Sequence, residues 1–180
     1  MAHQIVLTDL GPSSVTPEQF KLAFRHHAAG VAVITGDDGS GPVAITVSSV
    51  FSVSAEPPAL VFSLSNTSSA APHLLAAGKV VVHLLAPEHA QIAVNAATHG
   101  ANRFGDDVAW DRLPTGEPYY TDVHTWLRGE IVEQIVIGGS TLVVVHVLET
   151  HLASDQEPNR ALLYHNRKWA GLTQDSYFER

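Results

Sequence analysis

Residues 44–58, AITVSSVFSVSAEPP, decide the fold that the rest of the chain must fit. No charged residue occurs before Glu56, and the stretch ends at Pro57-Pro58. Because strand side chains alternate between two faces, we expect one long strand that ends at the double proline. One alternate set is mostly apolar: Ile45, Val47, Ser49, Phe51 and Val53. The other set consists mostly of small hydroxyls: Thr46, Ser48, Val50, Ser52 and Ser54.

The hydroxyl face of this stretch has two interpretations. Small hydroxyls let a flat ligand approach the backbone closely, and they supply hydrogen-bond donors and acceptors without bulk. Alternatively, the serines face an ordinary neighbouring strand, since most alternation of this kind is only architecture. The alternation by itself favours the second interpretation. On either, Ile45, Val47, Phe51 and Val53 should hold the interior of the fold.

Composition bounds the size and partners of the protein. The chain has 180 residues, of which 45% are hydrophobic, enough for one domain with a core. Only 16% are charged, which suggests that part of the surface is buried in a partner subunit. The net charge is −8 and no basic patch stands out along the sequence, which argues against a nucleic-acid partner.

Several kinds of site are disfavoured by residue usage. The chain has no cysteine, which excludes disulfides, Cys-ligated zinc, iron–sulfur clusters and thiol catalysis, and fits a cytoplasmic protein. The eleven histidines show no HExxH or HxH spacing, so we expect no metal site. The start of the chain does not resemble a secretory signal, and no apolar run approaches the ~20 residues of a membrane span. We therefore expect no membrane partner.

The remaining elements follow from periodicity and turn signals. Thr16 should cap a helix that begins at Pro17 and ends at Gly30, with Phe20, Phe24 and His27 in its core-facing stripe. Residues 1–15 and 173–180 are predicted as tails around one domain at 16–172. The other predicted strands cover 31–35, 59–65, 79–86, 123–137 (one or two strands), 141–151, 161–165 and 168–172. Two more helices are expected, one ending at 77 and one at 87–97, with an irregular arm at 110–118 and a polar loop at 154–160.

This element order predicts a mainly β protein. About seven strands with short connections favour antiparallel pairing. Strands do not alternate regularly with helices, which argues against a doubly wound sheet. The prediction is a closed or partly closed Greek-key barrel with flanking helices.

Known nucleotide and hydrolase motifs are missing. The sequence has no GxGxxG after a strand, no GxxxxGK[ST] and no GxSxG. Hydroxyls at a helix start can bind phosphate, and Ser68, Ser69 and Arg103 offer such a site. Equally, Ser68 and Ser69 could simply cap the next helix. The residues alone leave these two interpretations even.

Several segments, taken in order, resemble the flavin reductase family. These are GVAVIT at 30–35, AITVSSVFSVSAEPPALVFSLSNTSS at 44–69, VVVHLLA at 80–86, NRF at 102–104, GGSTLVVVHV at 138–147 and ALLYHNRKWAGL at 161–172. No single segment is highly specific, but their joint order and spacing is. The resemblance covers roughly residues 16–172.

The resemblance implies a fold and an activity. It implies an FMN-binding split β-barrel that forms a homodimer, with FMN or FAD near the subunit interface. It also implies hydride transfer from NADH or NADPH to flavin N5, with the reduced flavin passing to a separate monooxygenase. Because the flavin carries the chemistry, no catalytic side chain is required.

The resemblance also implies site residues. Thr46, Val47, Ser48 and Ser49 would line the flavin ring and ribityl chain, largely through backbone groups. Ser52, Val53 and Ser54 would lie beside the isoalloxazine edge. Ser68, Ser69 and Arg103 would meet the phosphate. Phe104 would pack near the site or the dimer contact.

Three positions depart from the family pattern: Val50, His83 and Ser140. The family often has a histidine at the turn that opens the last long strand, where this chain has Ser140. That departure puts the nicotinamide contacts in question; Ser140 and His165 are possible contacts, and Arg167 is an alternative. It also mildly favours a non-catalytic flavin- or haem-binding module, and another split-barrel flavin or deazaflavin oxidoreductase is a further alternative.

Overall fold

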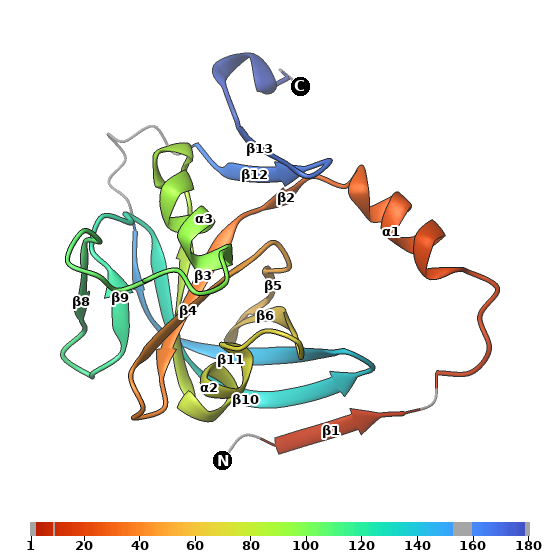
Figure 1. Cartoon of the computed structure of the whole chain (residues 1–180), viewed down its shortest axis with the longest axis horizontal. Helices are drawn as coiled ribbons and strands as arrows, with labels where there is room; N and C mark the ends of the chain where they lie inside the picture. The colour runs from red at the N-terminus through yellow and green to blue at the C-terminus, as the bar shows by residue number, and fades with distance from the viewer. Residues whose placement is uncertain (1–2, 9, 153–159, 179–180) are drawn as a thin grey trace.

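The computed structural model describes residues 3–8, 10–152 and 160–178, and it has the predicted mainly β, antiparallel architecture (Figure 1). The largest sheet has the strand order β4-β3-β7-β10-β11-β6-β5, with β1 also paired to β10. Its strands are β1 (His3–Leu7), β3 (Ala32–Asp37), β4 (Pro42–Val47), β5 (Phe51–Ala55), β6 (Pro58–Ser65), β7 (Lys79–Leu84), β10 (Trp126–Ile137) and β11 (Ser140–His151). All of its pairings are antiparallel except β1 with β10.

Two small sheets and three α-helices complete the fold. One sheet has the order β13-β12-β2, and the other pairs β8 with β9. Their strands are β2 (Ala29–Gly30), β12 (Leu162–His165), β13 (Lys168–Gly171), β8 (Trp110–Arg112) and β9 (Pro118–Tyr120). The helices are α1 (Pro17–Arg25), α2 (Ala71–Ala77) and α3 (Ala90–Ala97), with 3-10 turns at Pro87–His89 and Gln174–Ser176. No helix in the described ranges is both long enough and apolar enough to cross a membrane.

The core lies inside the curved main sheet. Its fully buried side chains include Ile34, Phe62, Leu64, Val82 and Val143, which come from four different strands. A second buried cluster lies under α3 and the β8–β9 hairpin and contains Val33, Ala93, Tyr120 and Leu162. Neighbouring residues Val33 and Ile34 enter different clusters because successive strand side chains point to opposite faces.

The stretch at 44–58 forms two strands rather than the one long strand predicted. β4 ends at Val47 and β5 begins at Phe51, with a bend at Ser48. The break is needed because β4 pairs with β3 whereas β5 pairs with β6, at the two ends of the strand path. An unbroken strand would have to continue in one direction and could not join both ends.

The bend also overturns part of the predicted core. Phe51 and Val53 were expected to hold the barrel interior, but they are 58% and 57% exposed. The alternation is interrupted by the bend, and a register shift between Ser52 and Ser54 interrupts it again. Ile45 does pack against the main core cluster, and Val47 belongs to it.

Helix α1 begins where the sequence predicted and ends earlier. The Thr16 hydroxyl accepts the Gln19 N–H, and the Gln19 side chain accepts the Thr16 N–H, a reciprocal capping box. The helix ends at Arg25, five residues before the predicted Gly30. None of its residues is buried, so the expected core packing of Phe20 and Phe24 was wrong for this chain taken alone. Figure 1 shows α1 standing to one side of the barrel, joined to it through β2.

Other boundaries also differ from the prediction. Residues 3–7 of the predicted N-terminal tail form β1, and the predicted arm at 110–118 lies within the β8–β9 hairpin, which ends at Tyr120. Residues 126–137 form a single long strand. The predicted polar loop at 154–160 lies outside the described residues except for its last position.

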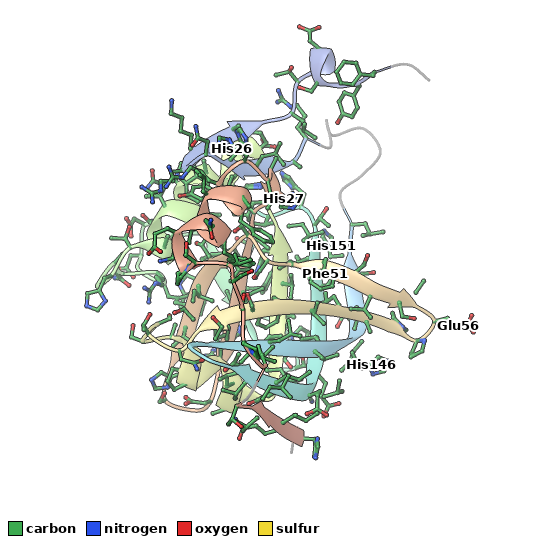
Figure 2. The ribbon with its side chains drawn as sticks, turned by 90° about the vertical axis from the view of Figure 1, so that its right-hand side faces the viewer. His26, His27, Phe51, Glu56, His146 and His151 are labelled. Carbon is green, nitrogen blue, oxygen red and sulfur yellow. The ribbon has the colours of Figure 1, made fainter. Side chains whose placement is uncertain are left out.

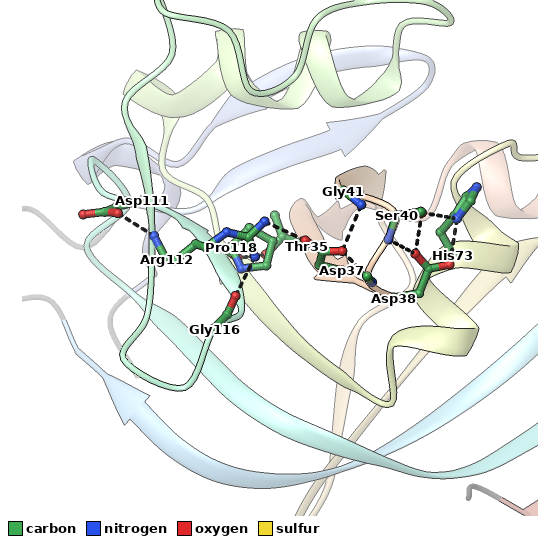
Figure 3. Close-up of polar contacts among 11 residues, drawn as sticks. Thr35, Asp37, Asp38, Ser40, Gly41, His73, Asp111, Arg112, Gly116 and Pro118 are labelled. Carbon is green, nitrogen blue, oxygen red and sulfur yellow. Dashed lines mark hydrogen bonds and ion pairs between the residues drawn. The ribbon is translucent and has the colours of Figure 1, made fainter.

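A charged turn joins three parts of the fold (Figure 3). Between β3 and β4, Asp37 accepts a hydrogen bond from Arg112 Nη2 at 2.6 Å, which ties the turn to β8. The adjacent Asp38 contacts the ring of His73 on α2 at 2.8 Å and is also bound by Ser40. The Ser40 hydroxyl and N–H and then His73 lower the pKa of Asp38 to about 2. Burial raises the pKa of Asp37, but the hydrogen bonds from Arg112, Gly39 and Gly41 outweigh it and leave that pKa lowered.

Candidate functional site

A groove of about 850 Å³ lies between α1, the bend after β4 and the β12–β13 turn. Its volume falls in the range of about 300–1,000 Å³ that ligand sites occupy. Figure 2 shows this side of the molecule, with His26 and His27 above Phe51. The lining residues are Phe20, Lys21, Phe24, Arg25, His27, Ala28, Ala29, Gly30, Ser48, Ser49, Val50, Phe51, Ser63, Tyr164, Asn166 and Arg167.

A smaller cavity of about 190 Å³ adjoins the groove. Ser48 and Tyr164 line both hollows, so the bend and β12 form their common wall. The other residues around the smaller cavity are Val31, Thr46, Val47, Ala97 and Trp169. Two aromatic side chains and three aliphatic ones give this cavity a mostly apolar wall, which suits the body of a flat ring.

The bend offers backbone donors to the groove. Ser48, Ser49 and Val50 lie between β4 and β5, outside the strand ladders. None of their N–H groups has a hydrogen-bond partner among the described residues. Peptide N–H groups need an acceptor when a ligand covers them, and the carbonyl-bearing edge of a flavin provides such acceptors. The bend therefore fits a flavin by the chemistry of its donor set.

The four predicted residues at 46–49 differ in whether their side chains are free to contact a ligand. The Thr46 hydroxyl donates to the Ala93 carbonyl at 2.6 Å, and the Val47 side chain is buried in the core. The Ser49 hydroxyl is bonded to Ser63. Ser48 alone among the four is exposed, and its hydroxyl has no partner in the described part of the chain.

The structure places residues 52–54 away from the groove. They lie on β5, which runs toward a projecting tip where Figure 2 labels Glu56. Neither hollow is lined by Ser52, Val53 or Ser54. The Ser54 hydroxyl accepts the N–H of Glu56 and so supports the hairpin turn.

The predicted phosphate residues come from two separate loops. Ser68 precedes α2, and its hydroxyl accepts the Ala70 N–H at 3.3 Å. The N-cap of α2 is Ala70 and has no side-chain cap hydrogen bond, so neither serine caps the helix as the alternative expected. Arg103 follows α3 and donates from Nη2 to the Thr98 carbonyl at 3.0 Å, while its buried Nε has no hydrogen-bond partner among the described residues. A buried guanidinium N–H without an acceptor fits an anionic ligand. No contact in the described ranges joins Arg103 to Ser68 or Ser69.

Phe104 has a packing role in the second core cluster. Its ring stacks on Tyr120 with centroids 5.6 Å apart and meets Trp110 edge-on at 5.0 Å. The neighbouring Arg103 carbonyl accepts the Tyr120 hydroxyl at 3.0 Å. The loop that carries Arg103 is therefore held in place by aromatic packing.

The structure separates the two possible nicotinamide contacts. Ser140 is exposed at the start of β11, opposite Ser65, and His165 lies at the β12–β13 turn with its ring 6.4 Å from that of His26. Neither lines the groove, whereas Arg167 does.

Sequence reasoning missed Tyr164, Trp169 and Arg25. Tyr164 and Trp169 are opposite each other in the β12–β13 register, and their rings lie 5.1 Å apart. A two-residue turn at 166–167 in YHNRKW would have paired these aromatics from sequence. Arg25 carried no signal, because its place beside the groove depends on where α1 stops.

Comparison with known proteins gives the same assignment as the fold. The sequence pattern of the "Flavin reductase like domain" matches residues 24–173. The chain belongs to the flavin reductase family. Its amino-acid sequence is 38% identical over 170 residues to an NADH:FMN oxidoreductase of Rhodococcus erythropolis, covering 89% of this chain and 88% of the relative.

Solved structures of family members superpose closely on the chain. The flavin reductase domain protein from Arthrobacter sp. FB24 is similar with a TM-score of 0.81 and 34% identity, over 88% of this chain and 96% of that one. BorF, the flavin reductase component of a bacterial two-component tryptophan halogenase, is similar with a TM-score of 0.76 and 25% identity, over 87% of this chain and 98% of its own. The predicted split-barrel fold is confirmed.

Proposed function

We propose that this protein is an NADH- or NADPH-dependent reductase of FMN or FAD. The observation that carries the proposal is the family match over residues 24–173, together with 38% identity to an NADH:FMN oxidoreductase along nearly the whole of both chains. The groove beside the Ser48 bend supports the proposal, because its volume is in the range of ligand sites.

The flavin ring is proposed to lie against the bend. The N–H groups of Ser48, Ser49 and Val50 would bind its polar edge, and the Ser48 hydroxyl would add one side-chain contact. Thr46 and Val47 would form part of the wall against which the ring lies, since they line the smaller cavity together with Tyr164. Ser68, Ser69 and Arg103 remain the proposed phosphate contacts, supported by the unpartnered Nε of Arg103. Ser52, Val53 and Ser54 remain proposals for the ring edge, and they have weaker support because they lie off the groove.

When bound, the flavin supplies the hydride acceptor at N5. The chain's own part is to hold the two rings in contact, which removes much of the entropic barrier. No acid–base pair is needed, which agrees with a bend that offers amides and a hydroxyl. Tyr164 and Phe51 flank the groove and would limit the access of water to the stacked rings.

A second copy of the chain is proposed to cover α1 and the start of β5. Phe20 and Phe24 are exposed on α1, and their rings lie 4.8 Å apart. Phe51, across the groove, is also exposed. A homodimer would remove this apolar surface from water. Sedimentation equilibrium tests this, and a monomer at micromolar concentration would contradict it.

The reduced flavin is proposed to leave for a separate monooxygenase or halogenase. BorF, similar at 25% identity, is the flavin reductase component of such a two-component system. A cytoplasmic location belongs to the same proposal, because the reductant would come from the cytoplasmic nicotinamide pool.

Flavin titration followed by reductant comparison tests the proposal. Quenching of FMN and FAD fluorescence gives the two dissociation constants, and mixing each complex with NADH or NADPH under nitrogen then shows whether the bound flavin is bleached. Bleaching by one of the reductants is expected. Flavin binding without bleaching would favour the non-catalytic binding module.

A further inference from the structure

The groove is lined by positively charged side chains, although the protein as a whole is acidic. The chain has 10 Lys and Arg residues against 18 Asp and Glu. Three of those ten, Lys21, Arg25 and Arg167, line the groove, and none of its lining residues is acidic. By contrast, Arg112 and Arg128 each pair with a carboxylate elsewhere. None of the three groove cations forms an ion pair with a carboxylate in the described residues, so their charge is available to an anionic ligand.

The backbone at Arg167 is strained. Asn166 and Arg167 have φ values of 48° and 62°, both in the left-handed region, and they join the paired residues His165 and Lys168. A two-residue hairpin turn with both central residues left-handed prefers Asn followed by Gly. Arginine at the second position costs about 1 kcal/mol or more relative to glycine. Strain of this kind clusters at ligand sites, and here it belongs to a residue that lines the groove.

Arg25 is fixed beside this turn. Its carbonyl accepts the N–H of Asn166 at 2.9 Å, so the end of α1 and the turn are joined at the residue next to Arg167. Lys21 lies one helical turn earlier, on the same side of α1 as Arg25. The three cations therefore form one strip, which we name the basic strip, from α1 to the tip of the β12–β13 hairpin.

We propose that the basic strip binds the pyrophosphate of the reducing dinucleotide, with Arg25 and Arg167 as its principal contacts. This inference rests on the proposed function, because it assumes that a nicotinamide dinucleotide enters the groove. Guanidinium groups bind phosphate oxygens in a bidentate manner, and two phosphates match two arginines. The phosphate of the flavin is the other possible source of such an anion. It is less suited, because its proposed contacts Ser68, Ser69 and Arg103 do not line the groove.

Arg167→Gly is the variant that tests the strip. It removes the guanidinium and places the preferred residue at the strained position, so the thermal midpoint should be unchanged or higher. The KM for NADH is expected to rise about tenfold, the effect of losing one charge-assisted hydrogen bond, with kcat little changed. The inhibition constant of ADP against NADH should rise in proportion, since ADP carries a pyrophosphate. Lys168→Ala is the matched control: it removes a cation from the same hairpin that does not line the groove, and it should leave both constants unchanged.

Three results would overturn the inference. One is an unchanged KM for NADH in both Arg167→Gly and Arg25→Ala. Another is a larger dissociation constant for FMN together with an unchanged KM for NADH, which would assign the basic strip to the flavin phosphate. The third is an equal effect in Lys168→Ala, which would indicate general charge attraction. If the wild-type protein does not oxidise NADH at all, the proposed function fails, and calorimetric titration of ADP into wild-type protein and Arg167→Gly still decides the anion site.

Discussion

The hydroxyl of Ser49 replaces a missing strand neighbour for Ser63. It donates to the Ser63 carbonyl at 3.1 Å and accepts the Ser63 N–H at 3.0 Å. The β5–β6 ladder stops at Phe51, opposite Val61, and Ser63 is the next residue whose backbone groups face that edge. One side chain thus satisfies both exposed backbone groups and holds the seam between β4 and β6.

Ser49→Ala should therefore act mainly on stability. Two part-buried backbone groups would lose their partner, and we expect the free energy of unfolding to fall by about 1–3 kcal/mol. Urea unfolding measures it, with Ser52→Ala as the control, because Ser52 is exposed and its hydroxyl makes no hydrogen bond with a described residue. Equal stability of the two variants would show that the seam does not depend on Ser49.

Ser48→Lys should act on flavin binding instead. Ser48 is exposed at the wall shared by the groove and the smaller cavity, so a long side chain would fill the proposed ring site without disturbing the core. The dissociation constant for FMN should rise at least tenfold while the free energy of unfolding measured in urea stays within about 0.5 kcal/mol of wild type. Thr150→Lys, at an exposed position on β11 that lines neither hollow, provides the comparison. Retained flavin affinity in Ser48→Lys would mean that the ring does not lie against the bend.

The burial and hydrogen bonds of His83 predict that the protein loses stability in weak acid. It is fully buried, its Nδ1–H donates to the Val33 carbonyl and its Nε2 accepts the Tyr120 N–H, both at 3.1 Å. These partners require the neutral ring, and burial lowers its pKa from 6.5 to about 4. The unfolded chain binds a proton at His83 below about pH 6.5 and the folded chain does not, so stability falls as the pH drops from 6.5 toward 4.

The contribution of His83 to this loss should be about 3 kcal/mol. His83→Asn removes the titrating group, so its unfolding free energy should change less than that of wild type over the same pH interval. The control is Thr150→Asn, at an exposed position that carries no titrating group, and its pH profile should follow wild type. Parallel profiles for wild type and His83→Asn would contradict the account.

The hydrogen bonds of Asp37 at the charged turn predict a further dependence of stability on pH. Hydrogen bonds from Arg112, Gly39 and Gly41 outweigh burial and lower its pKa, so the folded state favours the carboxylate. The resulting stability is present at neutral pH and is lost as the pH falls through that lowered pKa. Asp37→Asn should unfold at lower urea than wild type at pH 7, with the gap closing in strong acid. A gap that is constant with pH would show that the ion pair with Arg112 contributes nothing.

The fold class was predictable because it depends on local signals. Alternating segments with short connections gave the antiparallel barrel, and Thr16 followed by Pro17 gave the start of α1. The break at Ser48 was not predictable from alternation, because it results from β4 and β5 pairing with different strands. For the same reason, Phe51 and Val53 were wrongly predicted to be in the core.

The site was only partly predictable. The hydroxyl-rich stretch pointed to the bend, and there the structure leaves Ser48 available and engages Thr46 and Ser49 in internal bonds. Arg25 could not be found from spacing, since it reaches the groove through the early end of α1. The pairing of Tyr164 with Trp169 could have been found from the turn at 166–167. Arg167 was considered only as a substitute contact, and its strained backbone is visible only in three dimensions.

The central claim is that the groove holds a flavin and admits a reduced nicotinamide. Its most direct test is anaerobic stopped-flow mixing of the purified protein and FMN with NADH, followed at the flavin absorbance. We predict rapid bleaching that saturates with NADH concentration and is strongly slowed in Ser48→Lys but not in Thr150→Lys. No bleaching by NADH or NADPH, with either FMN or FAD, would contradict the account.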